Sequence, residues 1–348
     1  MKEMIETILY DKLEDNKVRC NICRHRCMVP IGKYGYCRTR MNRDGILYTL
    51  IFGRVSSFNA NPIEMKPLFH FFPGSLCFSM GTSGCNFRCP GCQNWEISRM
   101  SVEESGAGTE KITPEESIAL AVRYKCQGIS WTFNEPAIWL EYTIDGAKRA
   151  KEKGLYTAYV TNGFITPEGL DSISPYLDAF RVDIKGFSEE TYKKISSVSA
   201  WSGVLDSAKR AKHTHNMHVE CVTNVTHGIN DDENELLEMA QWIRDELGPD
   251  TPWHITRFYP HLDFSNIPIT PISNLERIRR RGLDAGLRYV YLGNVPGHPG
   301  ENTYCYTCKE MLIERKGYLV MKFNIKNGRC PECGTEIAGI FSAFETKS

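Results

Sequence analysis

The sequence SGCNFRCPGCQNW at residues 83–95 places three cysteines, Cys85, Cys89 and Cys92, within eight positions. Zinc in a structural site almost always takes four protein ligands, so three closely spaced thiols make an unusual zinc knuckle. The same thiols suit a metal centre that keeps one coordination position open. The segments around this stretch decide between the two interpretations.

The stretch follows the first of seven short apolar runs that have the character of β-strands. Each run is rich in β-branched or aromatic residues, and helix-like segments separate the runs. Thr113-Pro-Glu-Glu116, for example, has the cap, the first-turn proline and the glutamate of a capping box. Alternation of this kind predicts an α/β fold with a parallel sheet and right-handed crossovers, as in a partial TIM-like barrel. The predicted strands are Leu76–Met80, Gly128–Thr132, Leu155–Val160, Ala179–Ile184, His218–Thr223, Trp253–Phe258 and Arg288–Leu292.

In such a barrel the functional residues lie in the loops that follow the strands. The unusual residues of this chain fall there. The three cysteines follow the first strand, and residues 133–136 (Phe-Asn-Glu-Pro) follow the second. Residues 161–163 (Thr-Asn-Gly) follow the third strand, Lys185 follows the fourth, and Tyr259 with His261 follows the sixth. The sequence therefore predicts a site at this end of the barrel.

Two complete sets of four cysteines flank the predicted barrel. Cys305, Cys308, Cys330 and Cys333 form two C-x2-C pairs, and the residues between them suit a small β-ribbon. This spacing predicts a structural zinc ribbon, with a rubredoxin-like iron site as the alternative. The N-terminal set has the spacing C-x2-C-x3-C-x9-C and suits zinc or an iron–sulfur cluster, with structural zinc favoured. It consists of Cys20, Cys23, Cys27 and Cys37, with His25 and His70 as alternative ligands.

Composition narrows the classes of function. Lys plus Arg and Asp plus Glu each total 42, and this balance argues against a nucleic-acid binder, which would show a basic excess. No run approaches the ~18 apolar residues of a membrane span, and the first residues lack the apolar core of a signal peptide. We therefore expect a cytoplasmic protein without a membrane partner. In a reducing cytoplasm, metal binding explains the clustered cysteines better than disulfides do.

The motif C-x3-C-x2-C after the first barrel strand resembles the signature of radical S-adenosylmethionine (SAM) enzymes. The resemblance implies that Cys85, Cys89 and Cys92 ligate three irons of a 4Fe–4S cluster, while S-adenosylmethionine chelates the fourth iron. It further implies reductive cleavage of S-adenosylmethionine to a 5′-deoxyadenosyl radical that abstracts hydrogen from a substrate. An electron donor such as ferredoxin or flavodoxin would supply the electron.

Further motifs match the same superfamily and imply contacts with the cofactor. TFNEPAIW at residues 132–139 resembles a Gly-Gly-Glu-Pro segment, which places Glu135 on the amino group of S-adenosylmethionine. VTNGF (160–164) and VDIKG (182–186) resemble motifs of glycyl-radical-enzyme activases, which place Asp183 and Lys185 on the ribose or carboxylate. Val160 stands where those activases have an aspartate, a departure from their monovalent cation site. The implied contacts are Gly91, Gln93, Asn134, Glu135, Asn162, Asp183, Lys185 and Tyr259.

Motifs along nearly the whole chain resemble the radical SAM proteins of the AmmeMemoRadiSam system. This resemblance implies a partial (β/α)6 barrel at residues 61–300, a four-cysteine metal-binding module at 1–60 and a zinc ribbon at 301–348. It also implies Memo-like and AMMECR-type proteins as partners. The substrate, a small molecule or a protein, is left open. Activation of a glycyl-radical enzyme is the alternative function, and a non-enzymatic metal-stabilised binding module is a third.

Overall fold

The apolar runs in the middle of the chain form parallel strands. In the computed structural model, which describes residues 4–102 and 108–341, β11 (Gly128–Trp131) pairs in parallel with β9 (Leu76–Gly81) and with β12 (Tyr156–Thr161). Farther along the chain, β15 (Trp253–Arg257) pairs in parallel with β14 (His218–Val225) and with β16 (Val290–Gly293). With β13 (Ala179–Asp183), these strands match the seven predicted runs to within two residues at each end. The mixed α/β class with a parallel sheet is thereby confirmed, and closure into a barrel stays a prediction.

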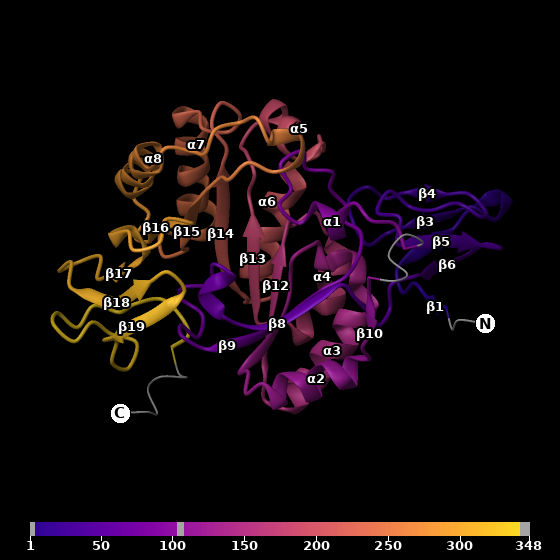
Figure 1. Ribbon diagram of the computed structural model, residues 1–348, viewed down its shortest axis with the longest axis horizontal. Helices are drawn as coiled ribbons and strands as arrows, with labels where there is room; N and C mark the ends of the chain where they lie inside the picture. Colours follow the sequence, from indigo (N-terminus) through magenta and orange to yellow (C-terminus); the bar gives the residue numbers. More distant parts are fainter. Residues whose placement is uncertain (1–3, 103–107, 342–348) are drawn as a thin grey trace. The chain divides into compact units, whose positions relative to one another are not determined.

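The described chain divides into two units, which are drawn together in Figure 1. The first unit takes residues 1–60, 77–180 and 200–217, and the second takes residues 61–76, 181–199 and 218–348. The first therefore holds β9, β11 and β12 with the N-terminal strands. The second holds β14, β15 and β16 with the C-terminal strands.

Capped helices follow the strands of the first unit. Helix α2 (Pro114–Arg123) begins with the predicted capping box, because Thr113 Oγ1 accepts from the Glu116 amide at 3.1 Å and Glu116 Oε2 accepts from the Thr113 amide at 2.7 Å. At the start of α4 (Pro167–Ile173), Thr166 Oγ1 accepts from the amide of Gly169 at 3.0 Å, a side-chain cap without the reciprocal glutamate. The unit also contains α1 (Trp95–Ser98), α3 (Leu140–Glu152), α6 (Ser202–Lys209), β7 (Arg54–Val55) and β10 (Glu110–Lys111), and β8 (Ser57–Pro62) begins in it.

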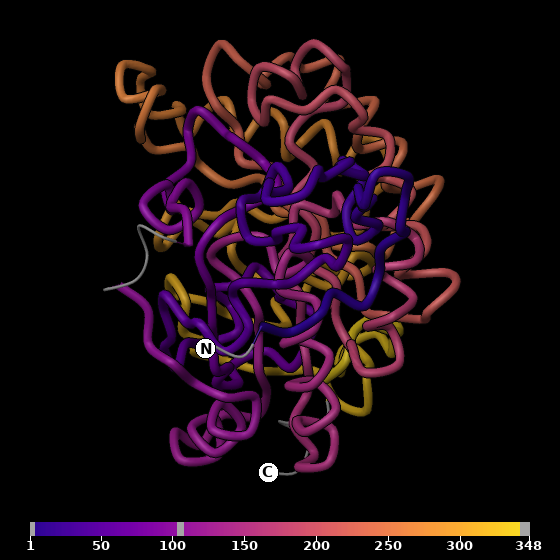
Figure 2. Tube along the Cα trace, turned by 90° about the vertical axis from the view of Figure 1, so that its right-hand side faces the viewer, coloured from indigo at the N-terminus to yellow at the C-terminus, as the bar shows by residue number. Residues whose placement is uncertain are grey.

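The N-terminal residues of the first unit, the indigo part of the tube in Figure 2, form two small antiparallel sheets. One has the strand order β1 (Ile5–Glu6), β6 (Ile46–Thr49), β5 (Arg40–Arg43), and the other has β2 (Tyr10–Lys12), β3 (Val18–Cys20), β4 (Met28–Val29). A buried ion pair, with Arg40 Nη2 and Glu141 Oε2 2.7 Å apart, joins β5 of the first of these sheets to α3. This N-terminal module therefore packs directly on the α/β part of its unit.

The second unit ends in a three-stranded antiparallel sheet with the order β17 (Thr303–Tyr304), β18 (Met311–Lys316), β19 (Leu319–Phe323). Its hydrophobic residues share one core cluster with Phe69, Tyr289 and Tyr291, and Cys305 and Cys330 lie in the same cluster. The helices of this unit are α5 (Glu189–Ser196), α7 (Glu233–Trp242) and α8 (Ile272–Asp284). No helix within the described residues is long and apolar enough to cross a membrane.

Candidate functional site

The loop after β9 carries Cys85, Cys89 and Cys92, all three partly accessible to solvent. The Arg88 guanidinium donates to the carbonyls of Cys85 at 2.7 Å and Phe87 at 2.9 Å, and these hydrogen bonds stabilise the conformation of the loop. The amide of Phe87 donates to Cys85 Sγ at 3.4 Å. Hydrogen bonds to cysteine sulfur are a recognised means of tuning iron–sulfur centres. The three thiols thus lie on a loop whose backbone is stabilised by hydrogen bonds within the loop.

Glu135 connects the loops that follow β11 and β12. Its carboxylate is 2% exposed, and Oε1 accepts from the amide of Ala137 at 3.0 Å and from Thr161 Oγ1 at 2.7 Å. Its Oε2 accepts from the amide of Asn162 at 2.8 Å. A buried carboxylate requires partners of this kind, because burial without them would strongly disfavour its charge. Glu135 therefore fixes two strand ends while placing negative charge beside the cysteine loop.

Three asparagines tie these loops to the cysteine loop. Asn162 Nδ2 donates to Asn86 Oδ1 at 2.8 Å, and Asn134 Nδ2 donates to the carbonyl of Gly84 at 2.6 Å. Asn134 Oδ1 also accepts from the amide of Thr82 at 3.2 Å. These hydrogen bonds consequently hold together the loops after β9, β11 and β12. Asn134 and Asn162 were predicted site residues, whereas Asn86 was not.

Two buried polar atoms of the cysteine loop, Ser83 Oγ and Asn86 Nδ2, have no hydrogen-bond partner among the residues that the structure describes. Buried polar groups in native proteins are nearly always satisfied, so each one left over calls for an explanation. Both groups can donate a hydrogen bond, and both lie within three residues of Cys85. They fit a bound group that carries acceptor atoms, such as the sulfides of an iron–sulfur cluster or the polar atoms of S-adenosylmethionine.

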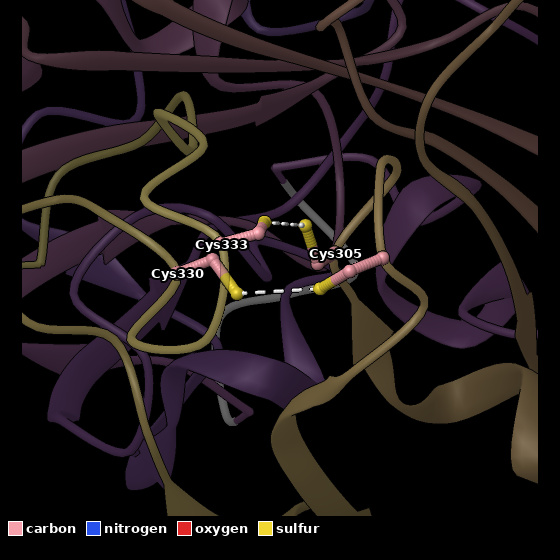
Figure 3. Close-up of side chains that lie close together, drawn as sticks. Cys305, Cys330 and Cys333 are labelled. Atoms are coloured by element: carbon pink, nitrogen blue, oxygen red, sulfur yellow. Dashed lines mark hydrogen bonds between the residues drawn. The ribbon is translucent and has the colours of Figure 1, made fainter.

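The C-terminal cysteines are already gathered as a four-thiol site, shown in Figure 3. The Sγ atoms of Cys305 and Cys333 lie 3.6 Å apart, as do those of Cys308 and Cys330, and all four lie within 4.8 Å of one another. Tetrahedral zinc with Zn–S bonds of about 2.3 Å would hold its sulfurs about 3.8 Å apart. The quartet therefore has the dimensions of a single-ion site.

Comparison with known proteins supplies the family. The family model "Radical SAM superfamily" matches residues 80–243. A protein of Methanocaldococcus jannaschii described as uncharacterized is 41% identical over 336 residues, which cover 96% of this chain and 99% of that protein. The chain belongs to the radical SAM superfamily. Membership implies a 4Fe–4S cluster and S-adenosylmethionine, and proteins of this superfamily are generally enzymes.

More distant relatives and solved structures share part of the chain. The pyruvate formate-lyase-activating enzyme of Clostridium pasteurianum is 29% identical over 119 residues, which cover 32% of this chain and 47% of that enzyme. Solved structures with the same fold include a radical SAM methyltransferase from Sphaerobacter thermophilus, with a TM-score of 0.50, 14% identity, and coverage of 66% of this chain and 71% of that one. The structure of Streptococcus suis SuiB has a TM-score of 0.51 at 10% identity, and the match covers 67% of this chain and 52% of the SuiB chain. The narrower resemblance to the AmmeMemoRadiSam proteins stays a prediction.

The predicted cofactor contacts of this radical SAM chain divide between the two units. Asn134, Glu135 and Asn162 join the cysteine loop in the first unit, and Gly91 and Gln93 lie on that loop. The remaining three residues, Asp183, Lys185 and Tyr259, belong to the second unit.

Asp183 lies at the end of β13, where it pairs with Arg181 and with Lys185 Nζ, the latter at 3.1 Å. Burial opposes its ionisation, yet Arg181 and Lys185 hold the pKa of Asp183 below its usual value. The carboxylate therefore stays charged at neutral pH. Tyr259 is exposed, and its hydroxyl donates to the carbonyl of Asn294 at 3.3 Å.

A buried hydrogen-bond network surrounds Glu220, a residue that no sequence pattern indicated. Its carboxylate is fully buried and accepts from the amides of Phe69 and His70, from His218 Nε2 at 2.8 Å and from His254 Nε2 at 2.6 Å. His254 of β15 is thus a partner of this carboxylate. His70 bonds through both ring nitrogens, to the Ala338 carbonyl and the Tyr291 hydroxyl, and neither nitrogen is available to a metal.

Proposed function

We propose that the chain reductively cleaves S-adenosylmethionine at a 4Fe–4S cluster held by Cys85, Cys89 and Cys92, and that the resulting 5′-deoxyadenosyl radical abstracts hydrogen from a substrate. The cysteine loop carries the proposal, because it presents three thiols and two unpartnered buried donors beside a buried carboxylate. Three thiolates leave one iron of a cubane for S-adenosylmethionine. The cofactor supplies the radical chemistry, while the protein supplies binding and orientation.

The residues of the first unit would act by position and charge. Glu135 and the Asn162–Asn86 contact hold the loops after β9, β11 and β12 in one arrangement, which fixes where the open position points. The buried negative charge of Glu135 favours an ammonium group nearby, in keeping with a role in orienting the amino group of S-adenosylmethionine. Asp183, Lys185 and Tyr259 are proposed contacts from the second unit.

A second candidate, activation of a glycyl-radical enzyme, is supported by the partial similarity to pyruvate formate-lyase-activating enzyme. In that case the hydrogen donor is a partner protein rather than a small molecule. We further propose that Cys305, Cys308, Cys330 and Cys333 hold structural zinc, since four thiolates leave no open position. The partners that the AmmeMemoRadiSam resemblance implies, Memo-like and AMMECR-type proteins, are proposed as protein substrates or as suppliers of one.

The test compares the wild type with Cys85→Ala and, as a matched control, Cys126→Ala, which removes a buried thiol outside the three cysteine clusters. Each protein is reconstituted anaerobically, reduced, and incubated with S-adenosylmethionine and a deuterated metabolite or partner extract. The wild type and the control should form 5′-deoxyadenosine, and Cys85→Ala should form none above background while keeping its zinc. Transfer of deuterium into 5′-deoxyadenosine identifies the hydrogen donor. A small-molecule donor supports the first candidate function, and a protein donor supports activation of a glycyl-radical enzyme. Equal product from Cys85→Ala and the control would contradict the proposal.

A further inference from the structure

The four N-terminal cysteines converge in one turn-rich segment of the first unit. Cys20 ends β3, and its amide donates to the carbonyl of Cys27 at 3.0 Å. The amide of Tyr36, which precedes Cys37, donates to Cys27 Sγ at 3.4 Å. Cys23 begins a turn closed by the Arg26 amide, and it forms a β-bridge with Ile165. Main-chain hydrogen bonds thus bring all four residues into one part of the module.

These thiols are shielded from solvent and share a charged neighbour. Cys20, Cys23 and Cys37 are buried, and Cys27 is partly so. The thiol of Cys23 interacts electrostatically with the other three thiols, and the buried guanidinium of Arg40 interacts with Cys20 and Cys37. The segment therefore has the surroundings of a metal site.

The spacing of the sulfurs separates this quartet from the C-terminal one. Across residues 4–102 and 108–341, Cys305, Cys308, Cys330 and Cys333 form the single group in which at least three His, Cys, Asp or Glu ligand atoms lie within 4.8 Å of one another. No three sulfurs of the N-terminal quartet meet this limit, although zinc would need them about 3.8 Å apart. Cys85, Cys89 and Cys92 do not meet it either. The N-terminal quartet thus resembles the triad for a cluster rather than the quartet for an ion.

We propose that Cys20, Cys23, Cys27 and Cys37 hold a second iron–sulfur cluster instead of the zinc that their sequence spacing favours. Four thiolates that each ligate a different iron of a 4Fe–4S cluster lie farther apart than four that share one ion. Two hydrogen-bond contacts to sulfur accompany the quartet, from the Tyr36 amide to Cys27 and between Cys37 Sγ and Thr39 Oγ1 at 3.1 Å.

The proposed cluster would lie against the loop that carries the radical SAM triad. His25 Nε2 lies 2.7 Å from the carbonyl oxygen of Asn86, and Arg88 donates to the carbonyl of Tyr36 at 2.9 Å while its guanidinium sits over the Tyr36 ring. These contacts join residues within two positions of Cys23, Cys27 and Cys37 to the neighbours of Cys85 and Cys89. The two iron centres would be neighbours within one unit.

The experiment uses the full chain with Cys85→Ala, Cys89→Ala and Cys92→Ala combined, so that iron elsewhere can be counted alone. After anaerobic reconstitution we expect about eight irons per wild-type chain and about four, with as many sulfides, in the triple variant. Adding Cys27→Ser and Cys37→Ser should remove the remaining iron and leave zinc unchanged. Cys308→Ser, the matched control, should lose zinc and keep iron.

Two results would overturn the proposal. One is a triple variant that holds no iron above background, and the other is a wild type with two zinc ions per chain of which Cys27→Ser with Cys37→Ser removes one. Should the five-fold variant fail to fold, the iron count and the electron paramagnetic resonance spectrum of the reduced triple variant still decide the question. Failure of the proposed function gives a different pattern, in which the triple variant retains as much iron as the wild type.

Discussion

At the residue scale, the buried carboxylate of Glu135 accepts three hydrogen bonds beside the cysteine loop. The sequence predicted a contact with the cofactor from the segment after β11. The structure adds three internal donors: the last residue of β12, the residue that follows this strand, and one from the first turn after Glu135 itself. The side chain thus organises the site as well as charging it.

We therefore predict that Glu135→Gln lowers both the stability of the protein and its affinity for S-adenosylmethionine. The amide keeps one acceptor oxygen but replaces the other with a donor that faces the Asn162 amide. The free energy of unfolding should fall by about 1–3 kcal/mol, the typical cost of an unsatisfied buried group. The dissociation constant for S-adenosylmethionine, measured calorimetrically on reconstituted protein, should rise. Glu238→Gln, at an exposed position of α7, serves as the control and should change neither quantity. Unchanged affinity with lowered stability would restrict Glu135 to an organising role.

At the element scale, the strands and capped helices were predictable because their signals are local. Short apolar runs and a Thr-Pro-Glu-Glu start are readable within a few residues, and α2 and α4 begin where the caps predicted. The N-terminal sheets were not predictable, because their strands of two to four residues carry little pattern. Their burial depends on distant partners such as Arg40 and Glu141, 101 positions apart. Contacts of that range leave no trace in a local window.

The cysteine loop itself depends on a glycine. Gly84 has φ +88°, and a Cβ there would lie 2.5 Å from Thr39 Cγ2 and 2.9 Å from the Cys37 carbonyl oxygen. We predict that Gly84→Ala displaces the loop, lowers the free energy of unfolding by about 1–3 kcal/mol and reduces the iron bound by the triad. Gly154→Ala separates the two causes, since Gly154 has φ +68° and open space around it. It should cost about 1 kcal/mol and leave iron content unchanged. Equal iron loss in both variants would mean that crowding at Thr39 is irrelevant.

At the scale of the whole molecule, the sequence anticipated both cysteine-rich ends and the α/β middle but not how the second unit is held together. Its C-terminal strands share one core with Phe69 and β16, and the buried Arg315 of β18 donates to the Phe69 carbonyl at 2.9 Å. Glu220 fastens the segment after β8 to β14 and β15. A lone buried glutamate among histidines has no sequence signature, which is why this network was missed.

The network predicts the response of the second unit to acid. Burial opposes the charge of Glu220, but hydrogen bonds from His218 and His254 hold its pKa well below the usual value. Burial also lowers the pKa of His70 to about 4. For both groups the unfolded chain binds protons at a higher pH than the folded one, so stability is lost as pH falls.

We expect the thermal midpoint to be constant near neutral pH and to decline from about pH 6.5, the pKa of an exposed histidine, through about pH 4. Scanning calorimetry of the full chain at intervals of pH checks this. Glu220→Gln should lower the midpoint at neutral pH, because it leaves buried donors without a charged acceptor. A midpoint that is independent of pH down to about 4 would show that His70 does not carry the response.

The contact between Cys23 and Ile165 has a further consequence for biosynthesis. The first four cysteines leave the ribosome long before the residues that cover them, since Arg24 bonds to a carbonyl 141 positions later. The thiols consequently remain exposed while the first half of the chain is being synthesised. Assembly of the proposed iron–sulfur cluster would then either follow translation of the chain up to Ile165 or require protection of the nascent thiols from oxygen until that residue emerges.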